Sequence, residues 1–385
     1  MAQSIQDPRL AFVVDYDDPQ AGITRKYQLM YFLTDKTIEM FDIKNRRIFL
    51  KRCPYASLEV NDLYLGATIT IFSRQLQVSE YGDEHTRKVF SKKSEATLGI
   101  IKPDGYEKMG EIFRCLSKEG IRVKNIHMVQ MTQEEAAHFF ERHQGQPYYR
   151  DLIQHMIAYP VIALHLVGED CITRWNKILG PADPVQAKQA APVSLRAKYG
   201  TSTVCNICHG SEDPQVADSE ILFFFGENAS VKRRNNAALS NCTLGIIKPH
   251  AIAQGIAGDI IQAILEDGFE ISAIALACMN TYDAEDFLEV YKGVVPEYPG
   301  IVEQLTSGAC WVMEIRAENA VQSFRQLCGP HDPEIARVLR PDSLRAKFGA
   351  DKVKNAIHCT DLPEDGVLEV EFFFRIMASK LVETK

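Results

Sequence analysis

The chain has 385 residues with a formal net charge of −8, and hydrophobic residues make up 46% of it and charged residues 24%. These values are ordinary for globular proteins and the length allows two or three domains, so they exclude a largely disordered, collagen-like or coiled-coil chain. The acidic balance also provides no general attraction to nucleic acid or to anionic membranes. An anionic substrate would therefore need a local group of cationic side chains.

The sequence further predicts a soluble protein of the cytoplasm. Its first residues, MAQSIQDPRL, lack the features of a secretory signal, and its apolar stretches, such as 161–167 and 271–279, are too short to span a bilayer. The ten cysteines are scattered singly apart from Cys205 and Cys208, which favours free thiols in a reducing compartment.

Residues 1–91 are predicted to form a small antiparallel β barrel or sandwich. They contain short β-type runs separated by turn residues, at 27–33, 37–43, 47–50 and 68–72. This part of the sequence has no glycine-rich phosphate loop, no Ser-His-Asp order and no metal-ligand pattern. A docking module is therefore favoured over an enzyme.

The remainder of the chain contains an internal repeat. The heptapeptide TLGIIKP occurs at 97–103 and 243–249, and SLRAK occurs at 194–198 and 343–347. So many shared landmarks at a nearly constant offset indicate a tandem duplication of a whole domain. We expect repeat A at 95–226, a polar and basic linker at 227–241, and repeat B at 242–377.

Each repeat has the pattern of an α/β sandwich in the order β-α-β-α-β-α, with a sheet that carries helices on one face. Helical spacing of apolar residues separates the expected strands, and glycines end the helices. The expected strands lie at 97–101, 121–131 and 161–167 in repeat A, and at 243–247, 269–279 and 309–315 in repeat B.

Both repeats preserve the same polar residues, which are Lys102, Arg196, Asn206, His209 and Glu220 in repeat A and Lys248, Arg345, Asn355, His358 and Glu369 in repeat B. A lone histidine is more often structural, and a duplication kept for packing would preserve apolar positions first. Cations around a histidine indicate an anion site with a nucleophile, as phosphoryl transfer requires. A neutral imidazole can accept a phosphoryl group, and a carboxylate can orient its ring.

The motif Asn206-Ile-Cys-His209-Gly-Ser, with Ile-Lys102-Pro-Asp and Ser-Leu-Arg196 before it and Glu220 after it, resembles that of nucleoside diphosphate kinases. The resemblance covers both repeats, and the domain order is similar to that of a member with a ciliary-type module before two kinase domains. It implies ferredoxin-like α/β domains that transfer phosphate from a nucleoside triphosphate to a diphosphate through a phosphohistidine. Mg²⁺ would arrive on the phosphates, without a metal site of the protein's own.

The resemblance also implies a role for each residue of the motif. The nucleophiles would be His209 and His358, and their rings would be oriented by Glu220, Glu369, Ser211 and Thr360. Phosphates and sugar would be held by Lys102, Lys248, Arg196, Arg345, Asn206 and Asn355. The base would stack on Tyr148 in repeat A and on Tyr298 in repeat B.

Both repeats depart from the family pattern. In repeat A, Phe140 replaces a tyrosine near the lysine, and Asn176 replaces an upstream arginine for which Arg174 or Lys177 would substitute.

Repeat B keeps that tyrosine as Tyr291 and that arginine as Arg325, but has His250 in place of aspartate and Cys359 in place of glycine after the nucleophile. Because the cysteine adds a Cβ where the backbone is constrained, we expect repeat A to be the more active.

A structural role is the main alternative. The resemblance implies association with microtubules of cilia or with the γ-tubulin ring complex, and location in the cytoskeleton at the axoneme, centrosome and spindle. The protein would then be mainly a microtubule-associated scaffold with weak or vestigial kinase activity. Short basic runs at 92–93 and 232–234 are either solvated linkers or weak contacts to acidic tubulin. Family members form homodimers, so we also expect the two repeats to pack together as a pseudo-dimer.

The segment from Cys205 to His209 matches the C-x-x-C-H signature of haem attachment. We reject this interpretation because repeat B has no such cysteine pair and the chain has no export signal. Zinc binding by Cys205 and Cys208 is also disfavoured, since no second ligand pair is in register.

Overall fold

The computed structural model describes residues 8–18, 21–55, 58, 60–90, 94–226, 229, 231 and 234–378. The chain divides into two compact units, residues 1–93 with 278–308 and residues 94–277 with 309–385. The segment 278–308, which belongs to repeat B in the sequence, lies in the same unit as the N-terminal module. None of the described helices is both long and apolar enough to cross a membrane.

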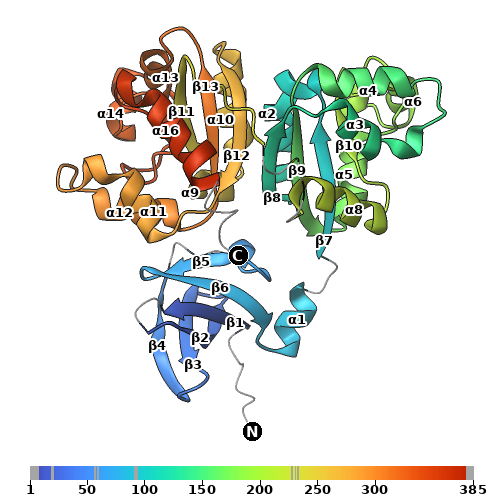
Figure 1. The fold of residues 1–385 in the computed structure, drawn as a ribbon. Helices are drawn as coiled ribbons and strands as arrows, with labels where there is room; N and C mark the ends of the chain where they lie inside the picture. Colours follow the sequence, from blue (N-terminus) through green and yellow to red (C-terminus); the bar gives the residue numbers. More distant parts are fainter. Residues whose placement is uncertain are drawn as a thin grey trace. The chain divides into compact units, whose positions relative to one another are not determined.

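The N-terminal module is a six-stranded antiparallel half-barrel with the strand order β4-β3-β2-β1-β6-β5, as Figure 1 shows. The predicted β-rich fold is confirmed, although the sequence patterns missed the first strand, the last strand and the closing helix. The elements are β1 (Arg9–Asp18), β2 (Ile23–Phe32), β3 (Thr37–Asp42), β4 (Arg47–Pro54), β5 (Thr68–Ile71), β6 (Arg74–Tyr81) and α1 (Glu84–Phe90). Buried side chains such as Phe12, Leu29 and Ile38 line the inner face of the sheet.

Two helices of repeat B, α11 (Thr281–Phe287) and α12 (Tyr298–Thr306), complete this unit. The hydroxyl of Thr70 on β5 donates a 2.6 Å hydrogen bond to the carbonyl of Thr306, and the amide of Gln75 donates one of 2.8 Å to the carbonyl of Met279. These bonds satisfy main-chain carbonyls at both ends of the helical segment. The N-terminal module therefore supports a helical hairpin that the sequence assigns to repeat B.

The larger unit is built on one sheet of eight strands in the order β10-β7-β9-β8-β12-β13-β11-β14 (Figure 1). Repeat A supplies the first four strands and repeat B the last four, and neighbouring strands are antiparallel. The strands are β7 (Ser94–Ile101), β8 (Arg122–Val129), β9 (Val161–Glu169) and β10 (Cys208–Gly210) in repeat A, and β11 (Cys242–Ile247), β12 (Glu270–Ala277), β13 (Cys310–Arg316) and β14 (Ile357–Cys359) in repeat B.

Helices cover both faces of the repeat A sheet. On one face α2 (Met109–Lys118) and α5 (Cys171–Leu179) form a core with Ile101 and Leu164. On the other, α3 (Gln133–Phe139), α4 (Tyr149–Ala158) and α8 (Pro214–Phe225) pack on Leu98 and Ile100. The expectation of helices on one face was therefore wrong, and the continuous apolar run of the first strand is the sign of a strand buried on both faces.

Shorter elements complete the two repeats. In repeat A these are the 3₁₀ helix η2 (Pro103–Lys108) and the helices α6 (Pro184–Ala190) and α7 (Leu195–Tyr199). In repeat B the larger unit contains the helices α9 (Pro249–Ala253), α10 (Ala257–Glu266), α13 (Ala320–Cys328), α14 (Pro333–Leu339), α15 (Leu344–Phe348) and α16 (Gly366–Glu371), the 3₁₀ helix η6 (Pro363–Asp365) and the π-helix η7 (Phe372–Met377).

The two repeats pack directly on each other, which confirms the expected intrachain pseudo-dimer. Strands β8 and β12 pair, and helices α2 and α10 cross where both backbones are glycine. A Cβ on Gly258 would lie 2.6 Å from the carbonyl oxygen of Gly110, so the close crossing requires glycine. The rings of Phe113 and Trp311 then meet at 4.6 Å across the same contact, and one continuous core spans both repeats.

The segment between the repeats is anchored rather than a free tether. The buried carboxylate of Glu314 accepts 2.7 Å hydrogen bonds from the main-chain N–H groups of Ala238 and Leu239. Arg234 forms an ion pair with Glu135. The other residues of the two basic runs, Lys92, Lys93, Lys232 and Arg233, lie outside the described residues.

Candidate functional site

Each candidate nucleophile lies on a three-residue edge strand, and the residue before that strand has the left-handed backbone conformation. His209 on β10 pairs with Ile100 on β7, and it follows Ile207, whose φ is 74°. This unusual conformation is held by Asp104, whose Oδ2 accepts a 2.8 Å hydrogen bond from the Ile207 N–H. The backbone therefore presents the imidazole of His209 at the edge of the sheet.

Repeat B reaches the same backbone geometry with a different acceptor. Ala356 has a φ of 70°, and its N–H donates a 3.2 Å hydrogen bond to Nε2 of His250. The aspartate-to-histidine difference between the repeats thus preserves the hydrogen bond that holds the nucleophile loop.

The imidazole rings are oriented as the sequence predicted. His209 Nε2 donates to Glu220 Oε2 at 2.9 Å, and the Ser211 hydroxyl donates to the same oxygen at 2.7 Å. In repeat B the corresponding distances to Glu369 are 3.1 Å from His358 and 2.9 Å from Thr360. A carboxylate can only accept, so Nε2 carries the ring proton.

Hydrogen bonding also fixes the charge of the repeat A carboxylate. Burial would raise the pKa of Glu220, but the hydrogen bonds from His209 and Ser211 lower it below its usual value. Glu220 is therefore ionised at neutral pH, and its contact with Nε2 leaves Nδ1 of His209 as the nitrogen that can attack an electrophile.

Two aromatic rings restrain His209 further. Phe139 and Phe140 meet the imidazole edge-on, with centroids 5.4 and 5.9 Å away. Phe140 was identified from the sequence as a replacement for tyrosine. Phe139 was not, because adjacent phenylalanines at the end of a helix usually indicate core packing.

The two buried lysines differ in how they are held. Lys102 Nζ donates to Asn206 Oδ1 at 2.7 Å and to the Val204 carbonyl at 3.0 Å, whereas Lys248 donates to the Val353 carbonyl at 3.0 Å. Burial lowers the pKa of Lys102 to about 8 and that of Lys248 to about 7. The ammonium of repeat A is thus the better preserved near neutral pH.

The two asparagines differ correspondingly. Asn206 also donates from Nδ2 to the Ala182 carbonyl at 2.9 Å. Asn355 donates to the His331 carbonyl at 3.1 Å, and its buried Oδ1 accepts no hydrogen bond within the described part of the chain. An unpaired buried acceptor of this kind suits a ligand that brings its own donor.

The arginines proposed to hold phosphates brace the nucleophile loops in this structure. Arg196 donates to the carbonyls of Gly180 and Cys208 at 2.8 and 3.0 Å, while its buried Nε has no hydrogen-bond partner among the described residues. Arg345 donates to the carbonyls of Gly329 and Ile357 at 2.9 and 3.1 Å. Both guanidinium groups thereby join the end of a helix to the strand that carries the histidine.

The residues at the position of the family's upstream arginine also donate hydrogen bonds to the nucleophile loop. Asn176 in repeat A donates to the Ser211 carbonyl at 2.8 Å, and Arg325 in repeat B donates to the Asp361 carbonyl at 2.6 Å. Arg174, considered as a substitute, instead donates to the Glu119 carbonyl at 3.0 Å.

The residue after each histidine is matched to the helix below it. A Cβ on Gly210 would lie 2.7 Å from the Trp175 ring and 2.9 Å from Leu179. Repeat B has smaller residues at the equivalent helix positions, Phe324 and Cys328, and there Cys359 is accommodated. Cys328 donates a hydrogen bond that, with the charge of Arg345, lowers the pKa of Cys359.

The aromatic residues expected to stack on a base lie in different surroundings. Tyr148, half-buried before α4, shares a 3.1 Å hydrogen bond between its hydroxyl and His143 Nδ1. Tyr291 and Tyr298 belong to the segment 278–308 that groups with the N-terminal module. Tyr298 is 9% exposed, so little of its ring is accessible.

Comparison with known proteins places this geometry in a family. The nucleoside diphosphate kinase family matches residues 95–230 and 241–378, and the N-terminal PH domain of nucleoside diphosphate kinase 7 matches residues 4–92. Nucleoside diphosphate kinase homolog 7 of Rattus norvegicus and of Mus musculus are each 45% identical over 377 residues, which is 98% of this chain and 95% of theirs.

The nucleoside diphosphate kinase of Aquifex aeolicus is a solved structure that is similar to part of this chain. It is 39% identical and covers 34% of this chain and 96% of its own, with a TM-score of 0.34. With both repeats matched and the relatives covered almost end to end, the chain belongs to the nucleoside diphosphate kinase family.

Proposed function

We propose that the chain transfers the terminal phosphoryl group of a nucleoside triphosphate to a nucleoside diphosphate through a phosphohistidine. The observation that carries the proposal is the doubled arrangement of histidine, carboxylate and hydroxyl, with Nε2 held by the carboxylate. Nδ1 of His209 would attack the terminal phosphorus, forming a P–N bond as the P–O bond to the diphosphate breaks. The same step in reverse would phosphorylate the acceptor.

In this mechanism the protein residues position and stabilise charge. Glu220 would hold the Nε2 proton and balance the positive charge of the imidazole as the P–N bond forms. The ammonium of Lys102 would contact the phosphates, and the Asn206 amide would fix its position. Mg²⁺ would enter with the triphosphate as part of the substrate, and neutralise phosphate charge.

We infer that repeat A contributes most of the activity at neutral pH. Its lysine and asparagine are joined by a hydrogen bond, and its lysine has the higher pKa of the two. The steric argument from Cys359 no longer supports this order, because the smaller helix residues of repeat B accommodate the cysteine.

The test is phosphoenzyme formation by the full-length chain with Mg²⁺ and γ-labelled ATP. We expect acid-labile, base-stable label that is discharged on addition of a nucleoside diphosphate. The matched control carries His209→Asn and His358→Asn together. Label in that control would show that another residue is phosphorylated, and no label in the unmodified protein would refute the proposed reaction.

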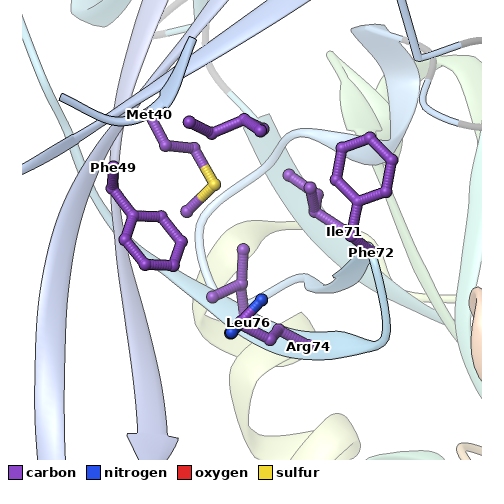
Figure 2. A pocket seen from close by; sticks show the side chains of 7 residues that line it. Met40, Phe49, Ile71, Phe72, Arg74 and Leu76 are labelled. Atoms are coloured by element: carbon purple, nitrogen blue, oxygen red, sulfur yellow. The ribbon is translucent and has the colours of Figure 1, made fainter.

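A docking role for the N-terminal module is proposed as a second function, with microtubules of cilia or the γ-tubulin ring complex as the partner and the axoneme, centrosome and spindle as the sites. It is supported by a pocket of about 330 Å³ between the edge strands of the half-barrel (Figure 2). The pocket is lined by Met40, Phe49, Leu50, Ile71, Phe72, Arg74 and Leu76. A pocket with one cationic side chain among apolar ones suits a partner protein that inserts an apolar residue flanked by acidic residues.

Arg74→Glu tests this role. It should weaken co-sedimentation with microtubules while phosphotransfer stays unchanged, and Lys44→Glu on an exposed turn is the control for net charge. Equal loss of binding in both variants, or no loss in either, would contradict docking at this pocket.

A further inference from the structure

Three potential metal ligands meet in repeat A from separate parts of the sequence. Asp104 lies on η2, His155 on α4 and Cys205 in the loop before β10. His155 Nε2 donates to Asp104 Oδ1 at 2.8 Å, and Cys205 Sγ lies 3.8 Å from His155 Nδ1. One donor atom from each residue lies within 4.8 Å of the other two, and no other group of three such residues occurs in the part of the chain that the structure describes.

We propose that Asp104, His155 and Cys205 bind a zinc ion, with water as the fourth ligand. A thiolate, an imidazole and a carboxylate together form a donor set that suits zinc. Zinc–ligand bonds of about 2.0 to 2.3 Å in a tetrahedron place donor atoms roughly 3.3 to 3.7 Å apart. Asp104 and Cys205 contact opposite ring nitrogens of His155, at 2.8 and 3.8 Å, so zinc binding requires the imidazole to turn and offer one nitrogen to the ion that the other two side chains hold.

The surroundings prepare the site without filling it. The Asp104 and His155 side chains are 20% and 16% exposed, so they are restrained but accessible to an ion. Asp104 Oδ2 stays bonded to the Ile207 N–H and orients the carboxylate, as outer hydrogen bonds do at zinc sites. Binding would release the Cys205 thiol proton to solvent and leave the single His155 ring proton on the nitrogen that does not bind zinc.

The fold itself does not require this group of residues. The equivalent positions of repeat B are His250, Gln304 and Lys354, so an amide and an ammonium replace the imidazole and the thiol. His250 retains the hydrogen bond that holds the residue in the left-handed conformation, which is Ala356 in repeat B. The Asp-His-Cys set is therefore an addition specific to repeat A.

The same three residues also match an activated thiol, in which a histidine held by aspartate removes the cysteine proton. Such a nucleophile needs a nearby donor for the oxyanion of its substrate. One backbone donor beside the cluster, the Ile207 N–H, is already bonded to Asp104. The proximity of three different donor types from three separate segments accordingly favours a metal ion.

The proposed site would tie α4 to the nucleophile loop. Cys205 lies four residues before His209 in sequence, and α4 begins beside Tyr148. Zinc would therefore stabilise the loop that carries the histidine without touching the reacting atoms. Metal binding can be measured without measuring phosphotransfer, so failure of the zinc proposal leaves the proposed phosphotransfer testable, and the reverse.

The experiment is a titration of the reduced, chelator-treated full-length chain with Co²⁺, followed by competition with Zn²⁺. We expect one equivalent of cobalt with tetrahedral visible bands and a thiolate-to-cobalt charge-transfer band, all removed by zinc. Cys205→Lys and His155→Gln, which introduce the residues of repeat B, should weaken binding by more than about 100-fold. Cys278→Ser, at an exposed cysteine, should bind like the unmodified chain.

Circular dichroism of each metal-free variant establishes that it is folded, and zinc should raise the unfolding temperature of the unmodified chain but not of the two site variants. Absence of the charge-transfer band would overturn the proposal. So would a band that persists in Cys205→Lys, because the metal would then be bound elsewhere. Rapid alkylation of Cys205 that depends on His155 and is unaffected by zinc would favour the activated thiol instead.

Discussion

Repeats A and B hold their histidines in the same way but surround them with different side chains. In both, a carboxylate and a hydroxyl orient the ring. In repeat A the residue after the histidine is a glycine, which lies against a tryptophan and a leucine of the neighbouring helix. In repeat B that residue is a cysteine, and the two helix residues are a phenylalanine and a cysteine. The comparison teaches that a substitution beside a nucleophile has to be judged with its packing partners, since large and small residues have exchanged places.

A second difference lies in the helical hairpin after the second strand of each repeat. In repeat A this hairpin packs on its own sheet through residues such as Ala136 and Met156. In repeat B the hairpin groups with the N-terminal module. Deletion of residues 1–91 would therefore expose part of repeat B.

The largest expected effect separates the two nucleophiles. His209→Phe should lower phosphoenzyme formation at pH 7 by on the order of 10³-fold at that site, because the attacking nitrogen is lost. His358→Phe should remove the smaller share of the total label. Peptide mapping of the labelled chain measures both, and a larger loss in His358→Phe would reverse the order of the repeats.

The next effect tests the exchange of packing partners. Gly210→Cys should destabilise repeat A by about 1–3 kcal/mol, because the added side chain overlaps the ring of Trp175. Adding Trp175→Phe and Leu179→Cys, which copy repeat B, should recover about half or more of that loss. Thermal unfolding followed by circular dichroism measures the three proteins. Additive destabilisation in the triple variant would contradict the compensation.

The pH dependence of nucleotide binding should differ between the repeats. Phosphate binding needs the ammonium form, so it weakens as pH rises through a lysine's pKa. Between pH 6 and 8 the charged fraction falls about tenfold for Lys248 and about twofold for Lys102. Calorimetric titration of Lys102→Met, which leaves repeat B, against Lys248→Met, which leaves repeat A, compares them.

Unfolding is not an explanation for such a loss of binding. A lysine whose pKa is depressed in the folded state binds fewer protons there than in the unfolded state, so its contribution to stability rises with pH from about 7 to 10.5. Parallel pH profiles for the two variants would show that the lysines do not control binding.

The smallest effect concerns the hairpin of repeat B. Thr70→Val removes the hydroxyl that bonds the Thr306 carbonyl and should cost about 1 kcal/mol. Hydrogen exchange should become faster in α12 and stay unchanged in α4, its counterpart in repeat A. An equal change in both helices would indicate a general loss of stability instead of a local one.

Much of the kinase fold and most of the candidate site could be predicted from the sequence. Three of the four strands of each repeat, the histidines and their glutamates were identified because short motifs carry them and the duplication shows each one twice, whereas the edge strands β10 and β14 were missed. The roles expected for Tyr291 and Tyr298 stay predictions, and the sequence did not indicate that their segment lies with the N-terminal module.

The sequence by itself determined the duplication, the α/β class and the histidine-carboxylate pairs, because these depend on local periodicity and on spacing within one motif. Only the tertiary structure decided which face of each strand is covered, how the glycine-to-cysteine change is accommodated, and that Asp104, His155 and Cys205 meet. The physical reason is that such contacts join residues far apart in the chain, and packing of whole elements, not local preference, brings them together.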